Sequence, residues 1–300
     1  RWTYSKLYPR GYTLMASPRL VLIGVIAVLT MSAVPVLVKS SVSNEFTIGT
    51  SRLAIAVLIF TPFVLWRGHL LQLSRRQWQQ LLLIGVVFGF HWLTYFASIK
   101  LATAAIAALT IITYSVQYLI LAWFFNGERV RPIEWLAIGV CFAGCVVVSP
   151  EFSLANDIFL GIAVGLLSAL LYAVMPLLHQ RARDIGTVER TWGQFFFALL
   201  VFLPFWTYTD WGFDRIELYH LLMLGTLCTV VSHGLWVKAS TELPAIYASM
   251  IYYLFLPGAL VGSVIFLGEE VTSAKLIGCA MVFGSSAALS IYRYRRRKVL

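Results

Sequence analysis

The chain of 300 residues is too apolar for an ordinary soluble domain. Hydrophobic residues make up 60% of it and charged residues only 12%, whereas soluble domains are roughly 45–50% apolar and about 25% charged. The formal net charge of +10 comes from Lys and Arg that lie between apolar runs and at the two ends. This distribution fits a membrane protein and argues against a nucleic-acid-binding protein. Composition therefore predicts an integral membrane protein without a nucleic-acid partner.

Apolar runs follow one another along the chain, and each is close to the length that a helix needs to cross a bilayer, about 20 residues. The first run is too long for the apolar part of a signal peptide, so we interpret it as a retained span. The connections are short and hold no nucleotide-binding loop of the form G-x-x-x-x-G-K-[ST], so any transport would be driven by a gradient. The sequence thus predicts an all-α integral membrane protein of ten transmembrane helices, at residues 20–38, 47–66, 78–99, 103–125, 132–149, 158–178, 191–208, 218–239, 244–267 and 273–292.

The distribution of Lys and Arg predicts the orientation of the chain. With the N-terminus inside, the inner segments hold 18 of the 23 Lys and Arg residues. Because cytoplasmic loops carry an excess of these residues, both termini are expected to be cytoplasmic. Residues 1–17 then form an N-terminal cytoplasmic segment, and residues 293–300 form a basic cytoplasmic tail.

An internal repeat is the strongest organisational signal in the sequence. His91 matches His233 at a shift of 142, and Gly127-Glu128 matches Gly268-Glu269 at a shift of 141. Matches between apolar residues alone would be weak, since membrane spans resemble one another in composition. Repeated His and Gly-Glu positions at one nearly constant shift are much less expected by chance.

The repeat divides the chain into residues 18–150 and residues 151–292, each with five predicted spans. Because five is an odd number, the second copy enters the membrane in the opposite sense to the first. Inverted repeats of this kind are known from transporters, which bind their substrate near the midplane between the halves. Two such halves can open a cavity to each side of the membrane in turn.

The fourth span of each half, with its exit and the following span, resembles the EamA-type repeat of the drug/metabolite transporter superfamily. The resemblance covers about residues 18 to 292, and it implies ten helices in inverted repeats, a multi-pass protein of the inner (plasma) membrane, and usually export of amino acids or related metabolites from bacteria. Many members carry a Pro inside the fourth span of both halves, whereas Pro257 has Val116 as its counterpart here. We therefore expect no kink at this point in the first half. The residues that carry the resemblance are Ala104, Ala107, Gly127, Glu128, Gly139 and Gly144, and in the second half Ala245, Ala248, Gly268, Glu269, Gly278 and Gly284.

Polar side chains inside the spans are candidates for a binding site, because they are costly in hydrocarbon and usually face the protein interior. His91 and His233 are the two histidines well inside predicted spans, and a histidine titrates near neutral pH, as coupling to protons requires. The alternative is that each hydrogen-bonds a neighbouring helix at a packing position. Arg52 begins the second span, where it either holds a substrate carboxylate or extends to the outer interface. We favour the second role, because long cationic side chains reach the interface readily.

Aromatic and polar side chains at helical spacing predict a cavity for an amphipathic solute. The rings would contact the apolar part of the solute, and the hydroxyl groups and an amide would contact its polar groups. The alternative for a single aromatic ring is packing against lipid or at the interface. Glu128 and Glu269 are expected to cap the connection to the next helix. The candidate substrate-binding residues are His91, Tyr95, Tyr114, Gln117, Tyr172, His233, Trp236, Tyr252 and Tyr253.

These patterns predict a secondary active transporter that exports amino acids or similar small amphipathic metabolites by alternating access. Uptake of such solutes and drug efflux are the alternatives, because topology does not set the net direction. An intramembrane enzyme is a remote alternative, since the sequence has no His-Glu-x-x-His pattern, and its four cysteines have no histidine at metal-ligand spacing. The expected partners are a small-molecule substrate, the lipid bilayer and protons as coupling ion, with no cofactor, metal or catalytic residue.

Overall fold

The computed structural model describes residues 17–126, 130–148, 155–243 and 245–297. Most of the predicted N-terminal segment, the end of the basic tail and Gly127-Glu128 lie outside the described residues. Every regular element within them is helical. The first half contains α1 (Pro18–Met31), α2 (Val34–Ser40), α3 (Glu45–Arg67), α4 (Arg75–Leu101), α5 (Ala104–Ile112), α6 (Tyr114–Asn126) and α7 (Pro132–Val147). The second half contains α8 (Asp157–Arg181), α9 (Thr187–Phe202), α10 (Arg215–Gly225), α11 (Ser232–Glu242), α12 (Ala245–Tyr252), α13 (Phe255–Leu267) and α14 (Ser273–Arg297).

Seven of the predicted spans coincide with helical stretches that are long and apolar enough to cross a membrane. The other three hold shorter helices, with α5 and α6 in the fourth span, α7 in the fifth and α9 in the seventh. The prediction of an all-helical membrane protein is therefore confirmed, whereas helical stretches of full spanning length account for seven of the ten positions among the described residues. The seven stretches are Pro18–Ser40, Glu45–Arg67, Arg75–Leu101, Asp157–Arg181, Arg215–Glu242, Met250–Leu267 and Ser273–Tyr292.

Local sequence fixes where α3 begins and ends and where α4 begins. The side chain of Asn44 accepts a hydrogen bond from the backbone N–H of Thr47 at 2.9 Å and caps α3. Gly68 ends this helix with a φ of +68°, a left-handed conformation that favours glycine. Ser74 then starts α4 through a capping box with Gln77.

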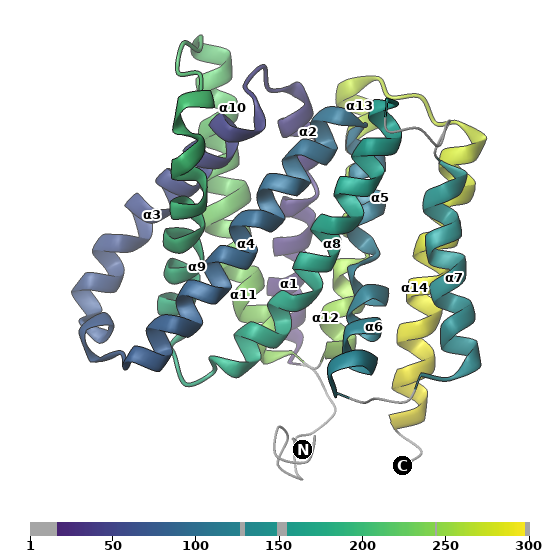
Figure 1. Cartoon of the computed structure of the whole chain (residues 1–300), viewed down its shortest axis with the longest axis horizontal. Coiled ribbons are helices and arrows are strands. Elements are labelled where there is room, and N and C mark those ends of the chain that lie inside the picture. The colour runs from purple at the N-terminus through teal and green to yellow at the C-terminus, as the bar shows by residue number, and fades with distance from the viewer. Residues whose placement is uncertain (1–16, 127–129, 149–154, 244, 298–300) are drawn as a thin grey trace.

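The helices stand side by side, and their connections gather at two opposite edges (Figure 1). α1 begins and α14 ends at the lower edge of this view. We call the helix ends at this edge the lower face and those at the opposite edge the upper face. α4 runs from the lower to the upper face, whereas its repeat counterparts α10 and α11 run from the upper to the lower face. The two halves thus have the opposite senses that the repeat predicts.

The main helix contacts join one half to the other and occur in repeat-related pairs. α4 packs along α8, and correspondingly α11 packs along α1. A Cβ atom added to Gly165 on α8 would lie 2.3 Å from Thr110 Oγ1, and one added to its counterpart Gly24 on α1 would lie 3.2 Å from Ile251 Cδ1. Thr110 and Ile251 are themselves separated by the repeat shift of 141. Equivalent positions of the two halves therefore meet across the interface.

The fourth span is broken in both halves, which corrects the expectation of an unkinked first half. One break separates α5 from α6, and the other separates α12 from α13 near Pro257. The first break has hydroxyl groups in place of a proline. Thr110 Oγ1 donates to the carbonyl of Ala107 at 2.9 Å, and Thr113 Oγ1 donates to the carbonyl of Thr110 at 2.7 Å. Such bonds compete with the helical ladder and bend helices, so Val116 does not prevent the break.

Candidate functional site

The larger of two adjoining cavities lies between helices of both halves, and we call it the lower cavity. Its volume is about 100 Å³, whereas one water needs roughly 10–15 Å³, so it has room for several waters or a small solute. His179 and Gln180 lie near the end of α8, and Ser240 near the end of α11, so the cavity reaches toward the lower face. Its lining comprises Phe88, Tyr114, Tyr118, Tyr172, Met175, Pro176, His179, Gln180, Gln194, His233, Trp236, Val237, Ser240 and Ala248.

A smaller cavity of about 20 Å³ lies deeper in the protein, and we call it the arginine cavity. Tyr172 and His233 line both cavities, so the two adjoin. The remaining lining of the arginine cavity is Met31, Val34, Arg52, His91, Trp92, Tyr95, Phe96, Ile111, Tyr252 and Phe255. Together the two cavities form the candidate site.

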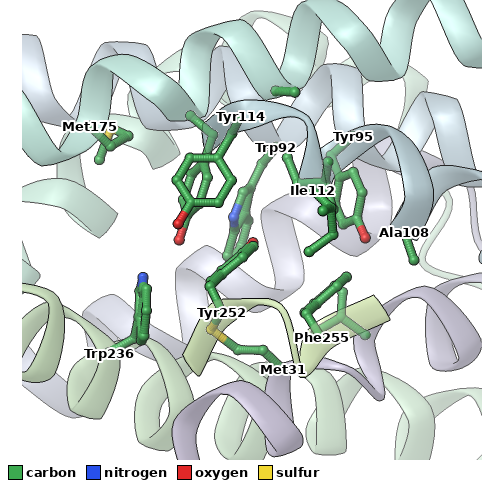
Figure 2. Close-up of a cluster of buried hydrophobic side chains, with 14 of the residues drawn as sticks. Met31, Trp92, Tyr95, Ala108, Ile112, Tyr114, Met175, Trp236, Tyr252 and Phe255 are labelled. Carbon is green, nitrogen blue, oxygen red and sulfur yellow. The ribbon is translucent and has the colours of Figure 1, made fainter. Parts of the chain in front are cut away.

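Aromatic rings from both halves meet where the cavities adjoin. Figure 2 shows Tyr114, Trp236 and Tyr252 turned toward a common space, from α6, α11 and α12. The ring centroid of Tyr252 lies 4.8 Å from that of Tyr114, 5.3 Å from that of Trp236 and 5.5 Å from that of Tyr172. These four predicted residues therefore form one cluster, which suits the apolar part of a solute.

The two predicted histidines differ in their surroundings. His91 Nδ1 lies 2.8 Å from Ser168 Oγ and 3.1 Å from the Ser168 carbonyl, so this ring has the helix-packing role that was the alternative to a binding role, although it also lines the arginine cavity. His233 makes ring contacts with Phe88 and Trp92, each at 5.4 Å. No hydrogen bond of the His233 ring occurs among the described residues, and this ring faces both cavities.

Two of the predicted site residues lie outside the lining of both cavities. The amide of Gln117 donates to Thr113 Oγ1 at 2.9 Å and to the carbonyl of Leu166 at 3.1 Å, which joins α6 to α8. The hydroxyl of Tyr253 donates to the carbonyl of Ser286 on α14 at 2.8 Å. Both side chains connect helices in this conformation.

Arg52 is the residue that the sequence interpretation placed wrongly. Its side chain does not extend to the interface, since only 1% of the residue is exposed. α3 begins at Glu45, so Arg52 lies two turns inside the helix and faces the interior. Its guanidinium carbon lies 4.1 Å from the centroid of the Trp92 ring and 5.1 Å from that of Phe96, a cation–π arrangement. Arg52 lines the arginine cavity.

A π-helical turn, Thr226–Val231, places two acceptors for Arg52 between α10 and α11. Arg52 Nε donates to Thr229 Oγ1 at 2.9 Å, and Nη2 donates to the carbonyl of Cys228 at 3.3 Å. Within the described part of the chain, the third nitrogen, Nη1, is buried without a hydrogen-bond partner, and no carboxylate lies within 4.0 Å of the guanidinium. Such π-helical turns often occur at functional sites.

The lower cavity contains polar residues that the candidate set omitted. Gln194 is the repeat counterpart of Arg52, and its Oε1 lies 2.8 Å from His179 Nε2. His179 was missed because the predicted sixth span ended at residue 178, whereas α8 continues to Arg181. The repeat held the signal for Gln194, because polar residues occupy the same position of the second span in each half.

The upper face is closed by Glu269, which does not cap the next helix as expected. Its carboxylate accepts hydrogen bonds from the backbone N–H groups of Ala104 at 2.8 Å and Ala105 at 3.4 Å. These N–H groups begin α5 in the other half. Thr272 caps α14 instead, since its hydroxyl accepts from the backbone N–H of Lys275. Glu269 therefore ties the two halves together.

A second contact between the halves closes the upper face near the start of α10. The Glu217 carboxylate accepts hydrogen bonds from the backbone N–H groups of Val42 at 3.1 Å and Ser43 at 3.2 Å, and from the hydroxyl of Ser41. The ammonium group of Lys100 donates to the carbonyl of Ser41 at 2.6 Å. Charged side chains thus bind the backbone of the connection between α2 and α3.

The model of the EamA-like transporter family matches residues 19–149 and again residues 159–291. The chain is 25% identical over 232 residues to the "Uncharacterized transporter YxxF" of Bacillus subtilis (strain 168), covering 75% of this chain and 74% of that protein. A solved structure described as "Crystal structure of protein" has the same fold, with a TM-score of 0.66, 21% identity, and coverage of 94% of this chain and 99% of that chain.

These matches confirm the family resemblance found in the sequence and indicate a transporter. Since the family model covers both halves, and its two matches coincide with the internal repeat, the chain belongs to the EamA-like transporter family.

Proposed function

We propose that this protein is a secondary active transporter that exports amino acids or similar small amphipathic metabolites by alternating access between its two repeats. The lower face is the cytoplasmic side in this proposal, as the excess of Lys and Arg on that side favours. The solute enters the lower cavity from the cytoplasm, contacts the aromatic cluster and leaves once the upper face opens.

The observation that carries the proposal is the unequal state of two equivalent positions. Ser98 and Ser240 are related by the repeat, yet Ser98 is fully buried and donates to the carbonyl of Gly161 at 2.7 Å, whereas Ser240 lines the lower cavity. One seam between the halves is thus closed while its counterpart is open. An exchange of these two states would open the cavity to the upper face.

Protons are the coupling ions in this proposal, and His233 is the group through which they act. It is the histidine that faces both cavities without a hydrogen bond among the described residues. The charged and titratable groups that line the two cavities with it are Arg52 from α3, His91 and Tyr95 from α4, Tyr114 and Tyr118 from α6, Tyr172 and His179 from α8, and Tyr252 from α12. Protonation of His233 adds a positive charge to the cavity that Arg52 also lines. The two positive charges repel each other, so the free energy of protonating His233 would depend on what occupies the cavity.

The test is transport by purified protein in liposomes without ATP. Liposomes loaded with single radiolabelled amino acids should release them faster with the protein present, and a proton gradient should drive accumulation against the solute gradient. Movement that saturates with solute and collapses with a protonophore supports the proposal. Release that is unaffected by the proton gradient would contradict the proposed proton coupling. If no amino acid or related metabolite is moved, the proposed substrate class is wrong.

A further inference from the structure

We propose that Arg52 is the anion-binding end of the transport site and that it takes the carboxylate of the solute. This rests on the proposed function and names the charged group by which the substrate is recognised. The solute would place its carboxylate in the arginine cavity and the rest of its structure among the aromatic rings toward the lower cavity.

The guanidinium charge of Arg52 is buried without a carboxylate partner among the described residues. Arg52 is 1% exposed and lies two turns inside α3. Buried charges in proteins are paired or coordinated, and in membrane spans they mark substrate or ion pathways. Among the described residues no carboxylate lies within 4.0 Å of Arg52. The charge therefore lacks the anion that its burial calls for.

One nitrogen of the guanidinium, Nη1, has no hydrogen-bond partner among the described residues. Trp92 and Phe96 lie against its carbon, and Nε and Nη2 donate to Thr229 and Cys228. The donors of Nη1 remain, buried and without a partner within the described residues. Because Arg52 lines the arginine cavity, a ligand there is the natural acceptor for them.

The size and the lining of the arginine cavity suit a carboxylate group. Its volume of about 20 Å³ exceeds the roughly 10–15 Å³ that one water needs, so a small polar group fits and a large one does not. The planar fork of a guanidinium matches the two oxygens of a carboxylate. Tyr95 lines the same cavity, and its hydroxyl is also buried without a partner among the described residues, so in this proposal it is a second donor for the bound group.

The repeat adds an independent point about the polarity of the site. Gln194, the counterpart of Arg52, is neutral and pairs with His179 in the lower cavity. The site therefore has a cationic group for a carboxylate on one side of the aromatic cluster and a neutral group on the other. A solute with one carboxylate and an amphipathic remainder fits this arrangement better than a dicarboxylate does.

The experiment compares acids with their amides on purified protein in lipid nanodiscs. The probes are leucine, phenylalanine and threonine, each against its carboxamide, with sodium chloride and sodium acetate at equal ionic strength as small anions. Binding is measured by calorimetry and by thermal stabilisation. In the unaltered protein the acid should bind about 10- to 100-fold more tightly than its amide, the range expected of a hydrogen-bonded charge.

The matched variants are Arg52→Gln and Arg67→Gln. Arg67 lies at the exposed end of the same helix, with its guanidinium carbon 5.2 Å from the Phe63 ring centroid, so it controls for loss of a cation–π arginine. Arg52→Gln should abolish the preference for acid over amide, Arg52→Lys should keep part of it, and Arg67→Gln should leave it unchanged.

The outcomes separate this inference from the proposed function. If acids and amides bind equally to the unaltered protein, the Arg52 inference is wrong and the transporter proposal stands. This comparison needs no variant, so it holds even if Arg52→Gln fails to fold. Full competition by chloride at millimolar concentration would assign the site to an inorganic anion and would also overturn the inference. If no probe binds and none is carried into liposomes, the proposed substrates fail as well.

Discussion

Replacement of Glu269 by Gln should open the upper face more often. The carboxylate of Glu269 accepts two backbone hydrogen bonds at the start of α5, at 2.8 Å from Ala104 and 3.4 Å from Ala105. It also lies 3.6 Å from the ammonium group of Lys275. A glutamine side chain keeps the length and one acceptor oxygen, so the substitution removes the charge and the weaker bond without leaving a void.

The magnitude follows from these contacts. A negative charge at a partly buried helix N-terminus contributes at most about 2 kcal/mol and more often about 0.3–1 kcal/mol, and a hydrogen bond to a charged group contributes about 1.5–3 kcal/mol. The contact with Lys275 spans 3.6 Å between side chains that are 15% and 11% exposed, and it adds about 0–1 kcal/mol. Because glutamine retains the shorter bond in a weaker form, we expect a net loss of roughly 1–2 kcal/mol, which raises the population of the open upper face about 5- to 30-fold.

The assay is the rate at which a water-soluble maleimide labels a cysteine at Ala108, in a background without the four native cysteines. Ala108 lies on α5 below the bonds of Glu269 and is fully buried. Labelling then requires opening, so its rate in nanodiscs follows the open population when opening is rapid. Glu270→Gln is the matched control, because this neighbouring residue is exposed. Equal labelling rates in Glu269→Gln, Glu270→Gln and the unaltered protein would refute the role of Glu269 in closing the upper face.

Three further predictions follow from other parts of the structure. His233→Gln should abolish the dependence of transport on the proton gradient while leaving the yield of folded protein intact, and unchanged coupling in liposomes would exclude His233 as the proton site. Gly144→Leu should lower the melting temperature, because a Cβ there would lie 2.9 Å from a backbone carbonyl of α14 and overpacking costs about 1–3 kcal/mol. Gly139→Leu on the same helix is its control, with nothing within 4 Å of an added Cβ, and equal melting temperatures would contradict the packing argument. Reporter fusions at Leu71 and Gly212 should report opposite sides of the membrane, and the same side for both would exclude inverted repeats.

The fold was largely predictable because the hydropathy of each residue and the identity of repeated residues can be read directly from the sequence. Apolar runs gave the helices, and the match of His91 to His233 gave the inverted halves. Where the prediction depended on the neighbours of a residue, it was less accurate. The break after α5 was missed because Thr113 makes it through a hydroxyl bond to a carbonyl, and threonine is too common in spans to indicate a break.

The candidate site was predictable in composition and less so in arrangement. Tyr114, Trp236 and Tyr252 lie in one cluster, and a binding role for them stays a prediction. The role of Arg52 depends on a π-helical turn 170 residues or more away in the sequence and on the covering ring of Trp92. No local pattern reports either feature, so the reach of a long cationic side chain decided the prediction and placed Arg52 at the interface.

The unequal spacing at Gly24 and Gly165 offers a way to trap the carrier in one conformation for structural work. The space beside Gly24 accepts a methyl group after a small shift of the flexible Ile251 end, whereas the space beside Gly165 does not. If the halves exchange states, Gly24 acquires the tight surroundings that Gly165 has now. Gly24→Ala should therefore be tolerated in the present conformation and should clash in the conformation in which the halves have exchanged states. A single methyl group would then block the conformational exchange.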